Sequence, residues 1–159
     1  MNRLYFLITV IRRELSELYF NYFHDNHVGC SFAELCNGTA QQKMLDYLGV
    51  EQTEKVMLQA IVNRETKARL MNGFVSDMGI NMVGNGIAVS VPIDYIGDES
   101  GMEYLLEGQG KCNSEVNDVS NGINDAQYAL VIAITRGGYA EMVMDAARRV
   151  DVKGGTGGH

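Results

Sequence analysis

Two histidines and a cysteine are spaced three residues apart in the stretch HDNHVGC. Imidazole nitrogen and thiolate sulfur are ligands of zinc and copper, so His24, His27 and Cys30 form a candidate metal site. The same stretch ends an expected helix, where histidine interacts favourably with the negative end of the helix dipole. The spacing is therefore compatible with a metal site that still lacks a fourth ligand, but it favours a helix terminus.

A glycine-rich turn at Gly84, Asn85 and Gly86 is the second candidate site. Glycine lets backbone N–H groups approach an anion closely, as they do in turns that bind phosphate. The turn also precedes an expected strand, and the pattern favours a turn that only starts this strand over a phosphate site. Another glycine-rich stretch, GGTGGH at residues 154–159, lacks the lysine and the following helix that a phosphate-binding loop needs.

Catalytic groups are not recognisable in this sequence. No serine or cysteine is visibly paired with a histidine and an acid, and no pair of carboxylates is supported by the pattern. The sequence therefore predicts a protein that is not an enzyme.

Composition limits the partners and the compartment. The net charge of −7 disfavours nucleic acid and anionic membranes as partners. The three cysteines are odd in number and lack CxxC spacing, so they predict neither a disulfide framework nor a zinc ribbon. The apolar run over residues 4–11 is too short to span a membrane, and Arg12 and Arg13 follow it in place of a cleavage site. We expect a cytoplasmic protein.

Hydrophobic periodicity predicts the elements that position these residues. Strands are expected over 4–11, 29–35, 56–62 and 87–93. Helices are expected over 12–27 and 64–79, the second with Asn63 as its N-cap and Gly79 just past its last turn. The order βαββαβ is typical of a ferredoxin-like, two-layer α+β sandwich with both helices on one face of the sheet.

The remainder of the chain predicts a linker and a partial second repeat. We expect a complete domain over 1–97, an acidic linker over 98–127, and the start of a second repeat over 128–159. Shifting the chain by 124 residues places Leu4–Arg12 on Tyr128–Arg136, which predicts a strand at 130–134. A helix should follow, with an apolar stripe of Tyr139, Met142, Val143, Ala146 and Ala147. The second copy ends before its further strands, so we expect a truncation at GGTGGH.

The two leading strands, Leu4–Ile11 and Leu130–Ile134, are apolar on both faces. A strand with one face in water should alternate between apolar and polar residues. Helices cover only one face of a two-layer fold, so the sequence predicts assembly through the other face of the sheet.

Together, the strand–helix–GGT stretch YALVIAITRGGYAEMVMDAARRVDVKGGT and the segment MVGNGIAVSVPI resemble the P-II nitrogen-regulatory proteins, in particular members with tandem repeats. The resemblance covers 1–97 and 128–159. It implies a trimeric signalling protein that binds adenine nucleotides between subunits, senses 2-oxoglutarate, and presents a long loop to a protein partner.

Carried onto this sequence, the resemblance implies an effector site at Gly84–Ile87 and a partner-binding loop over 37–54. The family has a lysine after the glycine turn that meets phosphate charge, whereas this chain has Ile87. Gln42 and Lys43 fall near a Gln-Lys pair of the family, and the resemblance implies that they belong to the effector site as well. Tyr47 lies in the same loop, but its neighbours do not match those of the family's modified tyrosine, so that role is not carried over.

The sequence thus predicts a non-enzymatic P-II-like signalling regulator of nitrogen or carbon status, with ADP or ATP as its effector. The alternative is a metal-binding trimer of the related copper-tolerance type that uses His24, His27 and Cys30.

Overall fold

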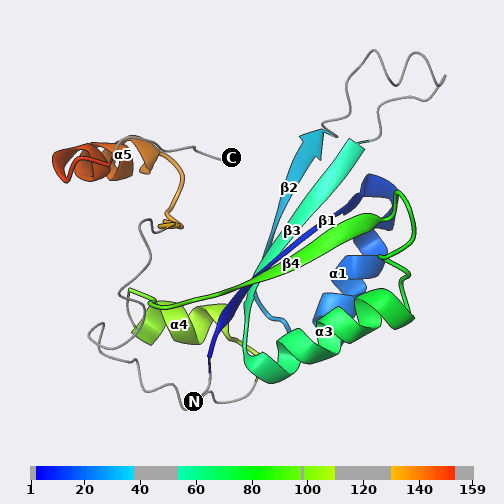
Figure 1. The fold of residues 1–159 in the computed structure, drawn as a ribbon. Helices are drawn as coiled ribbons and strands as arrows, with labels where there is room; N and C mark the ends of the chain where they lie inside the picture. Colours follow the sequence, from blue (N-terminus) through cyan, green and yellow to red (C-terminus); the bar gives the residue numbers. More distant parts are fainter. Residues whose placement is uncertain (1–2, 38–53, 98, 110–129, 153–159) are drawn as a thin grey trace, which may run out of the picture. The chain divides into compact units, whose positions relative to one another are not determined.

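The computed structural model describes residues 3–37, 54–97, 99–109 and 130–152 (Figure 1). Its described residues between Tyr5 and Pro92 form one antiparallel sheet with two α-helices. The elements are strands β1 (Tyr5–Arg12), β2 (Ser31–Asn37), β3 (Glu54–Val62) and β4 (Gly86–Pro92), the short 3-10 helix η1 (Arg13–Leu15), and helices α1 (Ser16–Asp25), α3 (Arg64–Ser76), α4 (Glu99–Leu105) and α5 (Ala140–Arg149). The order from β1 to β4 is βαββαβ, so the predicted α+β class is confirmed.

Strand β1 lies inside the sheet, whose order is β2-β3-β1-β4. It pairs antiparallel with β3, from Tyr5 opposite Val62 to Arg12 opposite Lys55. On its other side it pairs antiparallel with β4, where Ile11 is opposite Gly86. Because consecutive side chains of a strand point to opposite faces, these registers fix which side chains share a face.

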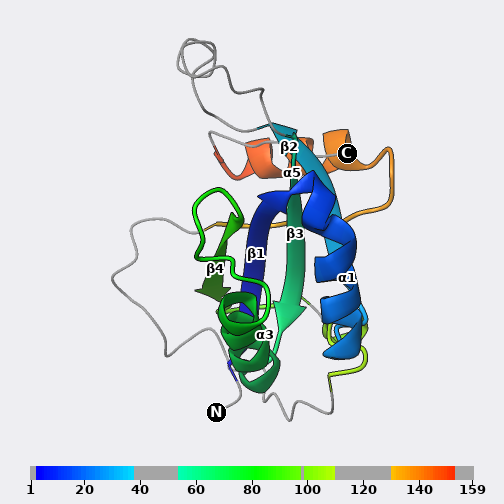
Figure 2. The same ribbon diagram turned by 90° about the vertical axis from the view of Figure 1, so that its right-hand side faces the viewer.

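Helices α1 and α3 lie side by side on one face of the sheet, as expected (Figures 1 and 2). The Phe74 ring of α3 lies between the helices, with its centroid 5.2 Å from that of Tyr19 and 5.9 Å from that of Phe23. The sheet contributes every second residue of β1 and β3 to the same core: Leu7, Ile11, Val56, Leu58, Ala60 and Val62.

The helix ends follow local sequence signals. The Asn63 side chain accepts a hydrogen bond of 2.9 Å from the backbone N–H of Thr66 and so caps α3, as predicted. Gly79 has a φ of +58°, a conformation that glycine adopts readily, and it lets Ile80 N–H bond to Phe74 O at 2.8 Å after α3 has ended. These contacts fix the start of the connection to β4.

Residues 99–109, at the start of the expected acidic linker, form helix α4 and a turn within the first compact unit, Met1–Gly122. Leu106 is buried, and the backbone N–H of Gly29 donates a 3.0 Å hydrogen bond to Glu107 O. The Gln109 side chain donates to Ile61 O at 2.8 Å and accepts from the backbone N–H of Asn63 at 3.1 Å. Apolar burial and paired backbone groups therefore hold this segment, although its charge and polarity resemble those of a linker.

Replacing Gln109 with alanine is expected to lower the free energy of unfolding by about 1–3 kcal/mol, because Ile61 O and Asn63 N–H lose their partners. Urea denaturation measures the change. Glu103→Ala, at an exposed position of α4, is the control and should change stability by less than about 0.5 kcal/mol. Equal effects of the two substitutions would contradict the docking of this segment.

The second compact unit, Ile123–His159, contains α5. Residues 130–134, where a strand is predicted, have no strand pairing in the single chain, and their large side chains are exposed, for example Leu130 at 80% and Val131 at 84%. A strand needs the backbone of a neighbouring strand for its hydrogen bonds, and the described part of this unit supplies none. The predicted helix does form, since its bonds are local.

Helices α1 and α5 correspond closely. The bounds of α5 are those of α1 shifted by 124 residues. Two residues after the end of each helix lies a residue of positive φ, His27 at 62° after α1 and Asp151 at 60° after α5. The next backbone N–H then bonds back to the helix, from Val28 to Phe23 O at 3.0 Å and from Val152 to Ala147 O at 3.1 Å. The two segments therefore share a helix phase, a length and a C-terminal motif.

Candidate functional site

The turn Gly84–Asn85–Gly86 lies between α3 and β4. The side chain of Asn85 holds it in place. Asn85 Nδ2 donates a 3.0 Å hydrogen bond to Gly79 O. Gly84 has a φ of +85°, and a Cβ there would meet no atom within 4 Å, so the turn is open on that side. A Cβ on Gly86 would lie 2.6 Å from Val10 O, which requires glycine where the turn approaches β1.

Two cations reach this turn from other strands. Arg12, the last residue of β1, donates from Nη2 to Asn85 Oδ1 at 3.3 Å. Lys55, near the start of β3, donates from Nζ to Gly84 O at 3.4 Å. The sequence reasoning missed both residues, because only the pairing of β1 with β3 brings them together.

Ile87 lies in β4 and has 60% of its surface exposed. By the sequence resemblance, a lysine is expected at this position. Ile87 lies opposite Val10 of β1, on the face of the sheet away from the helices. It extends an apolar row on that face and contributes no charge to the turn.

The sheet face away from α1 and α3, called here the open face, is largely apolar. In β1 it carries Phe6, Ile8 and Val10, which alternate with the buried core residues. The edge strand β4 leaves Val89 and Val91 each 44% exposed on this face. By the strand registers the remaining apolar members are Phe32, Met57, Ile61 and Ile87. The residues of Leu4–Ile11 are apolar on both faces because one set packs in the core and the alternate set lies on the open face.

The candidate metal residues do not converge. The His24 side chain is 91% exposed on α1, and His27 is the positive-φ residue that ends this helix. Cys30 is buried, with a side-chain hydrogen bond to Tyr104 of α4. Within the described ranges, no group of three or more His, Cys, Asp and Glu side chains could hold a metal ion. His27 therefore has a structural role in the helix terminus.

Burial raises the pKa of the Cys30 thiol above its ordinary value of 9.0, and burial likewise raises the pKa of Tyr19 above 10.0. The folded chain thus holds protons that the unfolded chain releases in alkali. We expect the contribution of these two groups to the free energy of unfolding to be constant below about pH 9 and then to fall, by at most about 1.4 kcal/mol per pH unit for each group.

Thermal unfolding between pH 7 and pH 11 tests this dependence. Cys30→Ala should flatten the first part of the decline, and Tyr19→Phe should flatten the part above pH 10. The Tyr19 hydroxyl is buried without a hydrogen-bond partner among the described residues, so Tyr19→Phe leaves no other group unpaired. Identical alkaline slopes in wild type and both variants would contradict the assignment.

Gln42, Lys43 and Tyr47 lie outside the described residues, as does most of the expected loop over 37–54. Glu54, which begins β3, is the last residue of that range and forms an ion pair with Arg13, the first residue of η1. The base of the loop is therefore described at this end.

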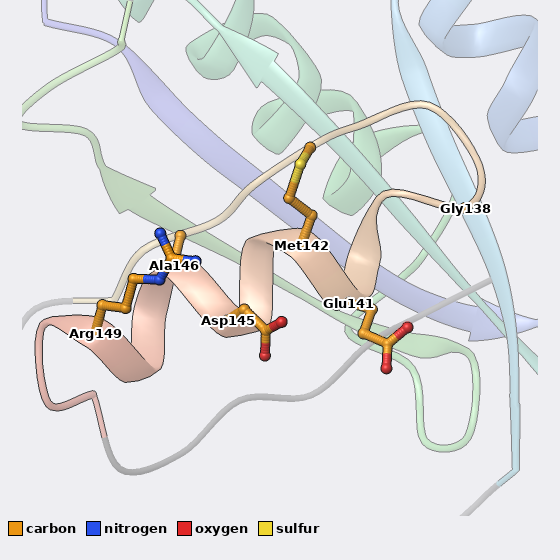
Figure 3. A pocket seen from close by; sticks show the side chains of 6 residues that line it. All are labelled: Gly138, Glu141, Met142, Asp145, Ala146 and Arg149. Carbon is orange, nitrogen blue, oxygen red and sulfur yellow. The ribbon is translucent and has the colours of Figure 1, made fainter.

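A hollow of about 380 Å³ lies beside α5 and is lined by Gly138, Glu141, Met142, Asp145, Ala146 and Arg149 (Figure 3). The lining residues recur at intervals of three and four, which marks one face of a single helix. Asp145 is further paired with Arg148 at 2.8 Å. The hollow is an open helix surface, and we place no effector site there.

No family model matches this chain, and no curated protein is detectably similar in sequence. Among solved structures, the chain is similar to CPII, a nitrogen regulatory PII-like protein from Thiomonas intermedia K12, bound to ADP, AMP and bicarbonate. The identity is 15% and the TM-score 0.45, and the match covers 57% of this chain and 90% of that one. The same protein bound to ADP, AMP and acetate gives the same identity and TM-score, with 86% of its chain covered.

In the described part of the chain, none of the helices has the length and apolarity needed to cross a membrane.

Proposed function

We propose that this protein is a non-enzymatic, P-II-like regulator that binds an adenine nucleotide at the Gly84–Ile87 turn and a protein partner through the loop over 37–54. The observation that carries the proposal is the open face of the sheet, an apolar surface that ends at an open glycine turn. A surface of this kind is suited to contact with another copy of the chain. The turn would then lie at the border of the contact between copies.

The proposed assembly follows from the number of apolar side chains on the open face. Ile87, Val89 and Val91 are each at least 44% exposed in the single chain. Burying a side chain of this size contributes roughly 1.5–3 kcal/mol, so covering several of them supplies a substantial driving force for assembly. A homotrimer is the proposed state, in keeping with the resemblance of the sequence.

The proposed second repeat is supported by the correspondence of α1 and α5. In α1, Tyr19 and Phe23 are buried against the sheet. Their counterparts at the 124-residue shift, Val143 and Ala147, are only half-buried. The 128–159 segment thus carries a helix of the same phase without a sheet of its own in the described residues.

In the proposed regulation, the effector would act by shifting the loop between conformations. A ligand changes such an equilibrium only by its difference in affinity for the two states. The loop connects β2 to β3. Lys55, the second residue of β3, contacts the glycine turn through its hydrogen bond to Gly84 O. A nucleotide at the turn would therefore contact the element at which the loop ends.

Thermal unfolding with ADP tests the effector. ADP at 100 times its dissociation constant is expected to stabilise the protein by about 2.7 kcal/mol, seen as a saturable rise in melting temperature. Adenosine, which lacks phosphate, is the control and should give a much smaller rise at equal concentration. No shift with ADP, ATP or AMP at millimolar concentration, in a sample that light scattering shows to be assembled, would contradict the proposal.

A further inference from the structure

Helix α5 presents an apolar face to solvent within the described residues of its own unit. Met142 is 60% exposed and Val150 is 73% exposed. In the first unit, by contrast, the corresponding helix α1 buries Tyr19 and Phe23 against the sheet. A helix of ten residues is marginal in water without such packing, because most of the stability of a short helix comes from its apolar face. The exposed face of α5 therefore indicates a contact surface.

The hollow beside α5 has a shape that fits a second α5. It has a volume of about 380 Å³ and is bordered by Met142 and Ala146, a large and a small side chain one turn apart on the same face. A helix surface on which a large side chain adjoins a small one can pack against a copy of itself that runs in the opposite direction. In such a pair, Met142 of each copy would lie over Ala146 of the other.

The charges of α5 favour the same antiparallel arrangement. Glu141 lies in the first turn and Arg149 is the last residue, so the two border the hollow near opposite ends of the helix (Figure 3). Asp145 is paired with Arg148 at 2.8 Å, whereas neither Glu141 nor Arg149 has an ion-pair partner among the described residues. Antiparallel packing would place each free carboxylate opposite the free guanidinium of the other copy. Parallel packing would place like charges together.

We propose that α5 is a contact surface for a second copy of this chain, and that the α5 helices of two copies pack antiparallel. Two ion pairs between Glu141 and Arg149 border the contact, one near each end. The contact goes beyond the proposed function, because it uses neither the open face nor the glycine turn. One helix face makes a small interface, so the contact is weak, with a dissociation constant on the order of 0.1–1 mM. Between assemblies formed through the open face, it would join one assembly to another.

Sedimentation equilibrium of the full chain carrying Val89→Asp measures this contact alone. An aspartate on the open face opposes association there, because a contact would remove water from an unpaired charge. From about 10 µM to 1 mM, the mass is expected to rise from that of one chain, 17.5 kDa, towards twice that mass. A mass that stays at one chain up to the highest concentration would overturn the proposal.

Exchanging the two charges tests the arrangement of the helices. In the same background, Glu141→Arg or Arg149→Glu places like charges together near both ends of an antiparallel pair, and each should weaken association about tenfold. An equimolar mixture of the two variants should associate as strongly as the parent, because each contact then joins a glutamate to an arginine. Both changes also oppose the helix dipole, but mixing could not restore a helix that had been lost. A parallel pair would not be weakened by either single change.

Glu17→Arg is the matched control. Glu17 is exposed on α1, 124 positions before Glu141, and the same change there should leave association within twofold of the parent. Equal weakening by Glu17→Arg and Glu141→Arg, or a mixture that associates no better than its components, would overturn the α5 contact. If wild type is itself a single chain at micromolar concentration and then pairs with this dependence on charge, the α5 contact stands while the proposed trimer fails.

Discussion

The proposed homotrimer is expected to dissociate into single chains of 17.5 kDa when Val89 is replaced with aspartate. Val89 lies in β4 on the open face, opposite Ile8 of β1, and is 44% exposed in the single chain. A carboxylate at this position stays hydrated in the monomer but would lose its water in a contact between copies. Removing water from an unpaired charge costs several kcal/mol, more than one apolar side chain contributes to an interface. Light scattering at micromolar concentration measures the mass.

The matched control is Val75→Asp. Val75 is exposed to a similar extent, 52%, but it lies on α3, on the other side of the sheet. We expect this variant to retain the mass of wild type. A wild-type protein that is already a monodisperse monomer, or equal dissociation by both substitutions, would show that the open face is not the assembly surface.

Replacing Phe74 with alanine is expected to lower the free energy of unfolding by about 3–5 kcal/mol. Phe74 is fully buried, and its ring contacts Tyr19, Tyr22 and Phe23 of α1. The substitution removes the ring that fills the space between α1 and α3, and the sheet beneath prevents the helices from closing the cavity completely. Urea denaturation followed by circular dichroism measures the loss.

Val75→Ala is the neighbouring control, because Val75 follows Phe74 on α3 but faces solvent. Its effect should stay within about 0.5 kcal/mol. If Phe74→Ala costs no more than this control, the two helices do not share the core described for them.

Local patterns were sufficient to identify most elements of this protein. Alternating and helical periodicities predicted the βαββαβ order, and the Asn63 cap of α3 followed from its place before an apolar repeat. The helix at 140–149 was also predictable, because helical hydrogen bonds join residues four apart and need no distant partner. The sequence likewise indicated the open face, since β1 is apolar on both sides.

Non-local pairing decided the remainder. Leu130–Ile134 has the composition of a strand, yet it forms none in the described structure, because strand bonds need a partner that composition does not provide. Residues 99–109 have a linker's polarity, yet they dock because Leu106 is buried and Gln109 pairs with distant backbone groups. The opposition of Arg12 and Lys55, 43 positions apart in the chain, exists only in the β1–β3 register. A shift of that register by one residue would place the two cations on opposite faces, so only the tertiary structure could bring them together at the glycine turn.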